Sequence, residues 1–531
     1  MMSNETMRRD VDAGDIQAIA RTAFLSLKAA RYMLLRVTEA DTAREWLRSL
    51  EPASVAGSST TDGQKICQIA FTAAGLMALG VASDVVKRFS PEFLEGMAGN
   101  DNRSLRLGDT GANAPANWNW GVGDREPHVL LMLFSDKDEI EAFANWMLSD
   151  ALAAGLSRIE VLSDSDMDGF EPFGFKDGIS QPSFDWDRPR TPGTRSDQDY
   201  TNLIALGELV LGYRNEYGLL TERPWLEAGD KHAGMLPSVP RERHDLGRNG
   251  SYLVYRQLAQ DVRGFWRWVK DEADRCGITK EQLAEAMVGR KLTGSPLADL
   301  TLGRPIPGVG VHREGNNGFL FDTDPDGLSC PIGAHIRRAN PRTGDMPGGR
   351  KGAIDTLLTM LGLTVRCDRH PTSSTLPWPR NTTVWPFFRS EDDAVASARF
   401  HRILRRGREY GEKLDRDAAF APGPADEGER GIHFLCLNAN IARQFEFVQG
   451  AWIASAKFAA LTGEQDPLLG NRRPFPDTPV ANQPELTDGF SRPGAPPRCR
   501  HARGLPQFVR VRGGAYFFLP GLTALKWIIS D

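Results

Sequence analysis

Apolar residues recur along the first part of the chain with two periodicities, one typical of buried strands and one typical of amphipathic helices. Short apolar runs predict four strands, at residues 31–37, 66–72, 128–134 and 158–162. Longer segments with polar residues near their starts predict helices at 38–50 and 135–154. The order is β-α-β followed by β-α-β, which is the order of a ferredoxin-like unit.

The same alternation returns in the second part of the chain. Strands are predicted at 251–258 and 431–437, and helical segments at 261–287 and 441–461. Residues 182–249, rich in Pro, Gly, Arg and Asp, are predicted to form a long loop. We therefore predict an α+β protein with two ferredoxin-like domains of antiparallel sheets and helices, at residues 1–165 and 166–531.

Composition excludes some classes of protein. Among 531 residues, 64 basic and 69 acidic side chains nearly balance, which gives no sign of a nucleic-acid or anionic-membrane partner. No stretch approaches the roughly 18 apolar residues of a membrane span, and the polar start shows no signal peptide, so a cytoplasmic location is expected. Six scattered cysteines without a CxxC pair favour buried or free thiols over a disulfide framework or a zinc site.

Three segments contain residues that could carry chemistry. Residues 174–182, GFKDGISQP, place Asp177 between two glycines. Spacing alone favours a simple turn in which the aspartate bonds its own backbone, by about two to one on ordinary turn statistics. Residues 330–342, CPIGAHIRRANPR, place His335 in a short apolar run. An imidazole there could bind haem iron with the neighbouring arginines near the propionates, or it could be a core histidine bonded to a backbone carbonyl.

The third segment is residues 401–411, HRILRRGREYG. Arg405 follows an apolar pair and could project inward, where its permanent charge would stabilise a developing anion. The alternative is a solvated basic face. The other histidines do not cluster at metal-ligand spacings, which argues against a zinc or non-haem iron site built from several histidines.

The order of these segments resembles that of the dye-decolorizing peroxidase family, in its larger, later-evolved branch. GFKDG matches the GxxDG signature of the family, AHIRRANPR resembles its axial-histidine segment, and ILRRGREYG resembles its distal-arginine segment. Further matches are RNGSYLVYRQL, LGYRNEYG, NANIARQFEFVQ and GGAYFFLPGLTAL. GxxDG alone is a weak signal, but seven ordered segments over most of the chain are specific.

The resemblance implies a peroxidase with one haem b per chain, held mainly by the second domain. It implies that Asp177 is the distal acid–base catalyst, Arg405 the distal cation and His335 the axial iron ligand. The implied cofactor contacts are His335, Arg337, Arg342, Gly178, Ile179 and Phe434. The implied partners are hydrogen peroxide and organic electron donors such as dyes and phenols, with no nucleic acid or membrane, for a monomer or homodimer.

Two features depart from the family pattern. Asn440 stands where relatives can carry an aspartate that supports the axial histidine, and Glu446 is the substitute candidate for that partner. Residues 344–398 form an insertion between the His335 and Arg405 segments, which could cover the haem entrance.

An aspartate that acts as the base gives an expectation for pH. Unperturbed aspartate titrates near ~3.9 and histidine near ~6.5, so dye oxidation is expected to have an acidic optimum. Two rival hypotheses remain open. One is a haem-binding or haem-handling protein with little peroxidase turnover, and the other is a structural or interaction protein that keeps the scaffold without haem.

Overall fold

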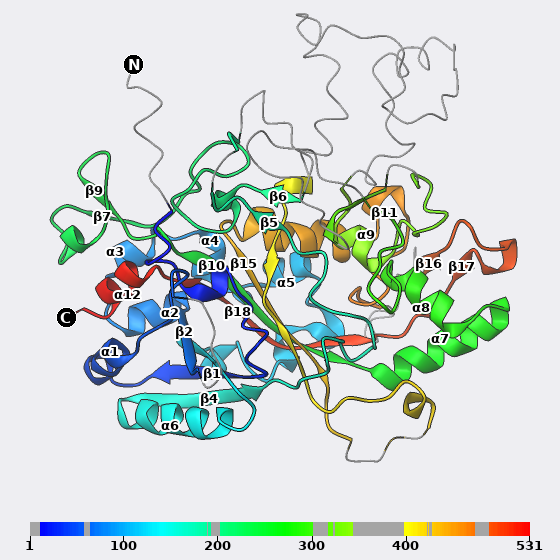
Figure 1. The fold of residues 1–531 in the computed structure, drawn as a ribbon, viewed down its shortest axis with the longest axis horizontal. Helices are drawn as coiled ribbons and strands as arrows, with labels where there is room; N and C mark the ends of the chain where they lie inside the picture. Colours follow the sequence, from blue (N-terminus) through cyan, green and yellow to red (C-terminus); the bar gives the residue numbers. More distant parts are fainter. Residues whose placement is uncertain are drawn as a thin grey trace, which may run out of the picture.

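The first ferredoxin-like unit is a four-stranded antiparallel sheet. The computed structural model describes residues 11–57, 64–187, 190–192, 202–300, 317–321, 324–342, 398–421, 423, 427–472 and 488–530. The elements of this unit are β1 (Ala29–Val37), α1 (Ala40–Ser49), β2 (Ile66–Phe71), β3 (Val129–Ser135), α6 (Ile140–Ala153) and β4 (Leu156–Ser163). The strands pair in the order β2-β3-β1-β4, and α6 packs along this sheet (Figure 1).

Four short helices connect β2 to β3. They are α2 (Ala73–Ala78), α3 (Ser83–Val86), α4 (Pro91–Glu95) and α5 (Asp101–Leu107). Ser90 and Asn100 cap α4 and α5 by accepting backbone N–H bonds at 3.4 and 2.9 Å, as polar residues at these positions commonly do.

The second unit repeats the arrangement with longer insertions. Its elements are β10 (Ser251–Gln260), α7 (Val262–Cys276), α8 (Lys280–Val288), β13 (Leu404–Arg405), β14 (Arg408–Tyr410), β15 (Gly431–Asn438), β18 (Val509–Leu519) and α12 (Leu522–Ile528). The strands pair in the order β13-β15-β10-β18, and β14 also pairs with β15. One residue pair, Phe518 with Phe71, joins β18 to β2, so the described strands of both units form one nine-stranded sheet (Figure 1).

One face of both units packs into a shared apolar core. Tyr32 of β1 and Tyr255 of β10 are fully buried there, with ring centroids 5.4 Å apart. Because side chains alternate along a strand, the neighbouring positions of β10 and β15 face the other way. Leu258 and Phe434 are on that second face, where they line a cavity. The sheet therefore separates the shared core from the cavity.

The remaining elements are short. They are β5 (Ser183–Phe184), β6 (Leu203–Ile204), β7 (Trp225–Glu227), β8 (Ser238–Val239), β9 (Arg243–Asp245), β11 (Asp299–Leu300), β12 (Phe319–Leu320), α9 (His335–Ala339), β16 (Phe490–Ser491) and β17 (His501–Ala502). The long loop predicted at 182–249 thus contains five short strands. The insertion predicted at 344–398 lies outside the described residues, except for its last residue.

The α+β class is confirmed, but three predicted helices differ in extent. The helix predicted from 135 begins at Ile140, because Ser135 still pairs with Ala29 in the sheet. The helix predicted at 261–287 is interrupted by Gly277, which ends α7 in a left-handed conformation at φ 67°. The segment predicted as helix at 441–461 forms two π-helical turns, Ala442–Glu446 and Val448–Ile453.

The cysteines only partly follow the prediction. Cys67, Cys330 and Cys436 are buried free thiols, but Cys276 and Cys499 form a disulfide that connects the end of α7 to the segment before β17. The two residues are 223 positions apart in sequence, so their spacing did not indicate a disulfide. In the part of the chain that the structure describes, no helix has the length and apolar character needed to cross a membrane.

Candidate active site

A large cavity lies on the second face of the β10–β15 sheet. Its empty space is about 1490 Å³ with its opening to solvent included, which is room for a ligand of cofactor size. The sheet contributes Leu258, Phe434 and Val509, the π-helical turns contribute Val448, and α9 contributes His335. Loop 171–180 and segment 401–407 complete the walls.

Asp177 is presented to the cavity by a loop with two left-handed glycines. Gly174 and Gly178 have φ values of 93° and 74°, a region in which residues with a Cβ are strained. The Asp177 N–H donates to the Gly169 carbonyl at 2.9 Å. The carboxylate of Glu171 accepts N–H bonds from Phe173 and Phe175, both at 3.1 Å. The loop is therefore fixed by bonds within its own segment, and Asp177 lines the cavity.

Arg405 lies beside Asp177. The nearest guanidinium nitrogen and carboxylate oxygen are 3.6 Å apart, and both side chains are about one-third exposed or less. The side-chain amide of Gln181 bonds both backbone groups of Arg405, accepting its N–H at 3.1 Å and donating to its carbonyl at 3.3 Å. Arg405 also donates from its guanidinium to the carbonyl of Ile179. A proton-accepting group and a fixed cation thus share one wall.

His335 is the first residue of α9 and lines the same cavity. Its Nδ1 lies 2.8 Å from Oδ2 of Asp466, whose side chain is fully buried. The other oxygen of Asp466 accepts the N–H groups of Leu468 and Leu469, both at 2.9 Å. Because a carboxylate only accepts, Nδ1 carries a proton, and a neutral His335 keeps Nε2 as an unprotonated nitrogen that can bind a metal.

The pKa of Asp466 reflects this environment. Burial alone would raise the pKa of its carboxyl group, but His335, the Leu469 N–H and Arg338 together hold the pKa below its usual value. Asp466 is therefore an anion, and its carboxylate is in contact with His335.

This pair corrects the expected partner of His335. Neither Asn440 nor Glu446 contacts it: the Asn440 side chain accepts the Arg443 N–H at 2.8 Å, and Glu446 accepts the Tyr516 hydroxyl at 2.9 Å. Asp466 lies 131 residues after His335 in an irregular segment. No motif spacing relates the two residues, so the sequence did not indicate that Asp466 is the partner of His335.

The other predicted cofactor contacts divide into two groups. Ile179 and Phe434 line the cavity, and Gly178 belongs to the Asp177 loop but is not among the lining residues. Arg337 is fully buried and binds Asp324 and the carbonyl of Cys330, away from the lining. Arg342 donates to the carbonyl of Phe319 at 2.7 Å and also does not line the cavity.

Other arginines do line the cavity. Arg290 and Arg402 contribute to its walls together with Arg405. Burial, followed by the nearby charge of Arg405, lowers the pKa of Arg290 to about 10, so its guanidinium remains charged at neutral pH. Sequence reasoning missed Arg290 because it follows the end of α8, far from the three recognised motifs.

Two further carboxyl groups lie in the electrostatic neighbourhood of Asp177. Burial, with a smaller contribution from the charge of Asp177, raises the pKa of Glu171 to about 7 and that of Glu409 to about 8. Glu171 lines the cavity, whereas Glu409 does not. An acid with a perturbed pKa in a cavity is typical of a functional site.

Fold and cavity together define an α+β protein of two ferredoxin-like units, with an anchored histidine and an adjacent aspartate–arginine pair in one pocket. No protein-family model matches the chain. The chain is 28% identical over 478 residues to dye-decolorizing peroxidase msp1 of Mycetinis scorodonius, covering 87% of this chain and 76% of that protein. It is 26% identical over 479 residues to dye-decolorizing peroxidase AauDyP1 of Auricularia auricula-judae, covering 87% and 75%.

Solved structures of DyP-type peroxidases also match this chain. The crystal structure of a fungal DyP-type peroxidase from Auricularia auricula-judae matches with a TM-score of 0.66 at 22% identity, covering 98% of this chain and all of that one. A DyP-type peroxidase from Anabaena sp. matches with a TM-score of 0.63 at 20% identity, covering 97% and 94%. The chain is therefore similar in sequence to enzymes named dye-decolorizing peroxidases and shares the fold of DyP-type structures.

Proposed function

We propose that this protein is a haem-dependent peroxidase that reduces hydrogen peroxide and oxidises organic donors, such as dyes and phenols, by one-electron steps. The observation that carries the proposal is the convergence of Asp177, Arg405 and His335 on one cavity of cofactor size. The homology to enzymes named dye-decolorizing peroxidases supports it.

The described residues fit a haem. The cavity walls are largely apolar, as a porphyrin requires, and His335 offers a nitrogen that Asp466 orients from behind. The arginines that line the cavity, Arg290 and Arg402, are better placed for the propionates than Arg337 and Arg342. The chain has no CxxCH motif for covalent attachment, which favours haem b.

Haem, when bound, supplies the iron at which peroxide reacts and accepts electrons from the donor. The carboxylate of Asp177 can take the first proton from the peroxide and return it to the oxygen that leaves as water. The guanidinium of Arg405 keeps its charge throughout and offsets the negative charge that develops as the O–O bond breaks. His335 would bind the iron through Nε2, and Asp466 keeps the proton of its Nδ1 in place.

The test is an absorption spectrum of the purified protein before and after one equivalent of peroxide. We expect a Soret band that changes within the mixing time, and slow change in Asp177→Asn and Arg405→Leu variants that still bind haem. His335→Ala should lose haem or its axial ligation. Wild-type rates in both distal variants would refute the assignment, and a Soret band that does not respond to peroxide would indicate a haem-binding protein with little turnover.

The finer expectations belong to the same proposal. They are one haem b per chain held by the second unit, a monomeric or homodimeric state, a cytoplasmic location, and no nucleic-acid or membrane partner. A pyridine haemochrome spectrum checks the haem type and stoichiometry. Light scattering of the haem-loaded protein checks the oligomeric state.

A further inference from the structure

The wall that carries Arg405 has little regular structure of its own. In segment 400–405 only Leu404 and Arg405 pair with β15. Four of its residues, His401, Arg402, Ile403 and Arg405, line the cavity. Something other than the sheet must therefore fix the first part of this segment.

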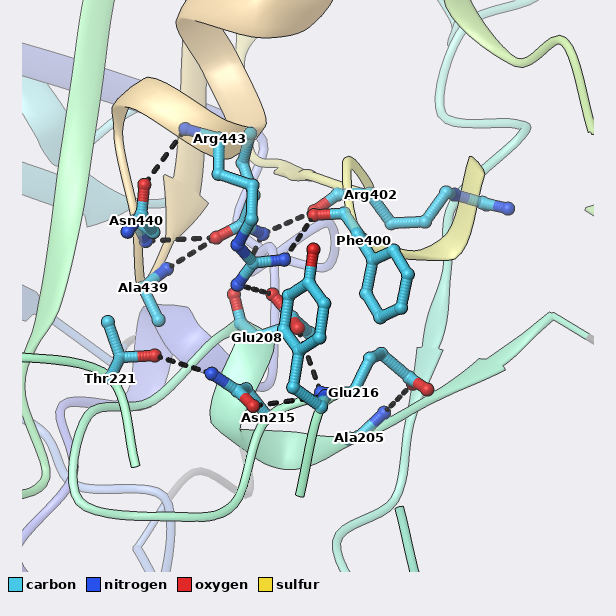
Figure 2. A network of polar contacts seen from close by, with 12 residues as sticks. Ala205, Glu208, Asn215, Glu216, Thr221, Phe400, Arg402, Ala439, Asn440 and Arg443 are labelled. Carbon is cyan, nitrogen blue, oxygen red and sulfur yellow. Dashed lines mark hydrogen bonds and ion pairs between the residues drawn. The ribbon is translucent and has the colours of Figure 1, made fainter. Parts of the chain in front are cut away.

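Side chains from the first π-helical turn supply the missing contacts (Figure 2). The Arg443 guanidinium donates to the carbonyl of Phe400 at 2.6 Å, and the Gln444 amide donates to the carbonyl of Arg402 at 2.5 Å. The Arg443 carbonyl also contacts Nδ1 of His401. Every residue from 400 to 402 is thus bound through a polar atom to residues 443 and 444.

Arg443 is itself anchored by a buried anion. Its other terminal nitrogen lies 2.6 Å from the carboxylate of Glu208, whose side chain is fully buried, and Figure 2 shows the guanidinium between Glu208 and Phe400. Burial raises the pKa of Glu208, and Arg443 opposes this shift. The planar guanidinium binds a carboxylate with one edge and a carbonyl with the other, which a lysine ammonium cannot reproduce.

Gln444 connects Glu208 to the end of strand β15. Its amide nitrogen also donates to the Glu208 carbonyl at 2.9 Å. Its amide oxygen accepts the N–H groups of Ala439 and Asn440, at 3.1 and 2.9 Å, immediately after β15. The loop at Glu208, the end of β15 and segment 400–402 are therefore held as one unit.

We infer that Arg443, clamped by Glu208, is a positioning residue that sets the place of Arg405 in the cavity by holding Phe400 and His401. This inference rests on the proposed function, because it assigns to Arg443 an effect on the distal cation. Arg443 is not among the residues that line the cavity, so it acts through its neighbours.

The test uses the haem-loaded protein and cyanide, an anionic ligand of ferric haem whose affinity depends on the neighbouring cation. The variants are Arg443→Lys, Arg405→Lys and the double variant, with cyanide affinity measured by titration and the peroxide reaction by stopped flow. The matched control is Arg223→Lys. Arg223 has a similar exposure, 15% against 17%, and also binds a buried carboxylate, that of Asp245.

We expect Arg443→Lys to weaken cyanide binding about tenfold, the order of one misaligned charge-assisted hydrogen bond. The Arg223→Lys control should leave cyanide affinity unchanged. The double variant should bind cyanide no more weakly than Arg405→Lys alone, because Arg443 acts through Arg405. If Arg443→Lys does not accumulate, Glu208→Gln should weaken cyanide binding in the same direction.

Two results would overturn the inference while leaving the proposed function intact. One is a loss of thermal stability in Arg443→Lys with unchanged cyanide affinity, which would make the network purely structural. The other is strict additivity in the double variant. If Arg405→Lys itself leaves cyanide binding and the peroxide reaction unchanged, the proposed role of Arg405 is wrong and the inference falls with it.

Discussion

Replacing Asp466 by asparagine is the sharpest test of the histidine side of the cavity. The substitution keeps the size of the side chain and its bonds to the Leu468 and Leu469 N–H groups if the amide oxygen takes the place of Oδ1. The amide NH₂ group then faces His335 Nδ1 at the position where Oδ2 accepts at 2.8 Å. Two donors oppose each other, so His335 is driven to move its proton to Nε2, the nitrogen needed for iron.

The size of the effect follows from the bond that is lost. A hydrogen bond to a charged group contributes about 1.5–3 kcal/mol, which corresponds to about 10- to 150-fold in an equilibrium constant. Replacing a residue that hydrogen-bonds a metal-binding side chain typically changes metal affinity by about 10- to 100-fold, which agrees with this range. Because Asp466 is fully buried, solvent screening reduces neither figure.

The assay is titration of haem into the apo protein, followed by redox titration of the complex. We expect the Asp466→Asn variant to bind haem at least about tenfold more weakly. Its potential should rise by about 60 mV or more, since 59 mV is a tenfold change for one electron. Asp324→Asn is the matched control, because Asp324 is a buried acceptor of the Cys330 N–H but does not touch His335. Unchanged affinity and potential in Asp466→Asn would refute the argument.

Three further predictions concern stability and the Asp177 loop. Because the folded pKa of Glu409, about 8, exceeds the unfolded value of about 4.3, its contribution to stability is fully present below pH ~4 and is lost as pH rises to ~8. Glu409→Gln should flatten this part of a thermal-midpoint profile. Cys499→Ser removes the disulfide with Cys276 and should lower the free energy of unfolding by about 2–4 kcal/mol in urea without reductant. Gly174→Ala forces a side chain into φ 93°, which costs about 1–3 kcal/mol, and should slow the peroxide reaction by displacing Asp177.

Each of these predictions has a matched control. Glu45→Gln removes an exposed carboxylate on α1 and should leave the shape of the pH profile unchanged. Cys276→Ser should match Cys499→Ser, and the double variant should be no less stable than either. Gly229→Ala places a Cβ in open space at an ordinary φ and should react with peroxide at the wild-type rate. A wild-type rate in Gly174→Ala as well would show that Asp177 does not depend on the loop conformation.

The main strands could be predicted from the sequence because one or both of their faces are buried, which leaves a regular pattern of apolar residues. β1, β3, β10 and β15 are apolar runs whose residues enter the cores on either side of the sheet, so local pattern and tertiary burial agree. Helix ends were less predictable, because they depend on single contacts such as the pairing of Ser135 with Ala29.

The candidate site was predictable only where a motif marks it. Asp177, His335 and Arg405 lie in recognisable segments, and all three line one cavity. Asp466 and Arg443 lie in segments whose local sequence predicts only turn or helix, and their importance comes from contacts across 131 and 43 residues with His335 and Phe400. Pairings between irregular segments leave no periodic signature in the chain.

The apolar residues that line the cavity and its polar residues Asp177 and Arg405 are held by different kinds of structure. This difference predicts different effects of substitutions. Leu258 and Phe434, which line the cavity, come from paired strands, whereas Asp177 comes from an irregular loop with left-handed glycines. Arg405 ends a segment that side chains hold, with Gln181 on its own backbone and Arg443 on that of Phe400. Strand positions cannot shift without disturbing the shared core on the other face of the sheet, but loop positions can. Substitutions in the walls should therefore act on haem affinity and stability together. Substitutions in the loops should act on the peroxide reaction while haem stays bound.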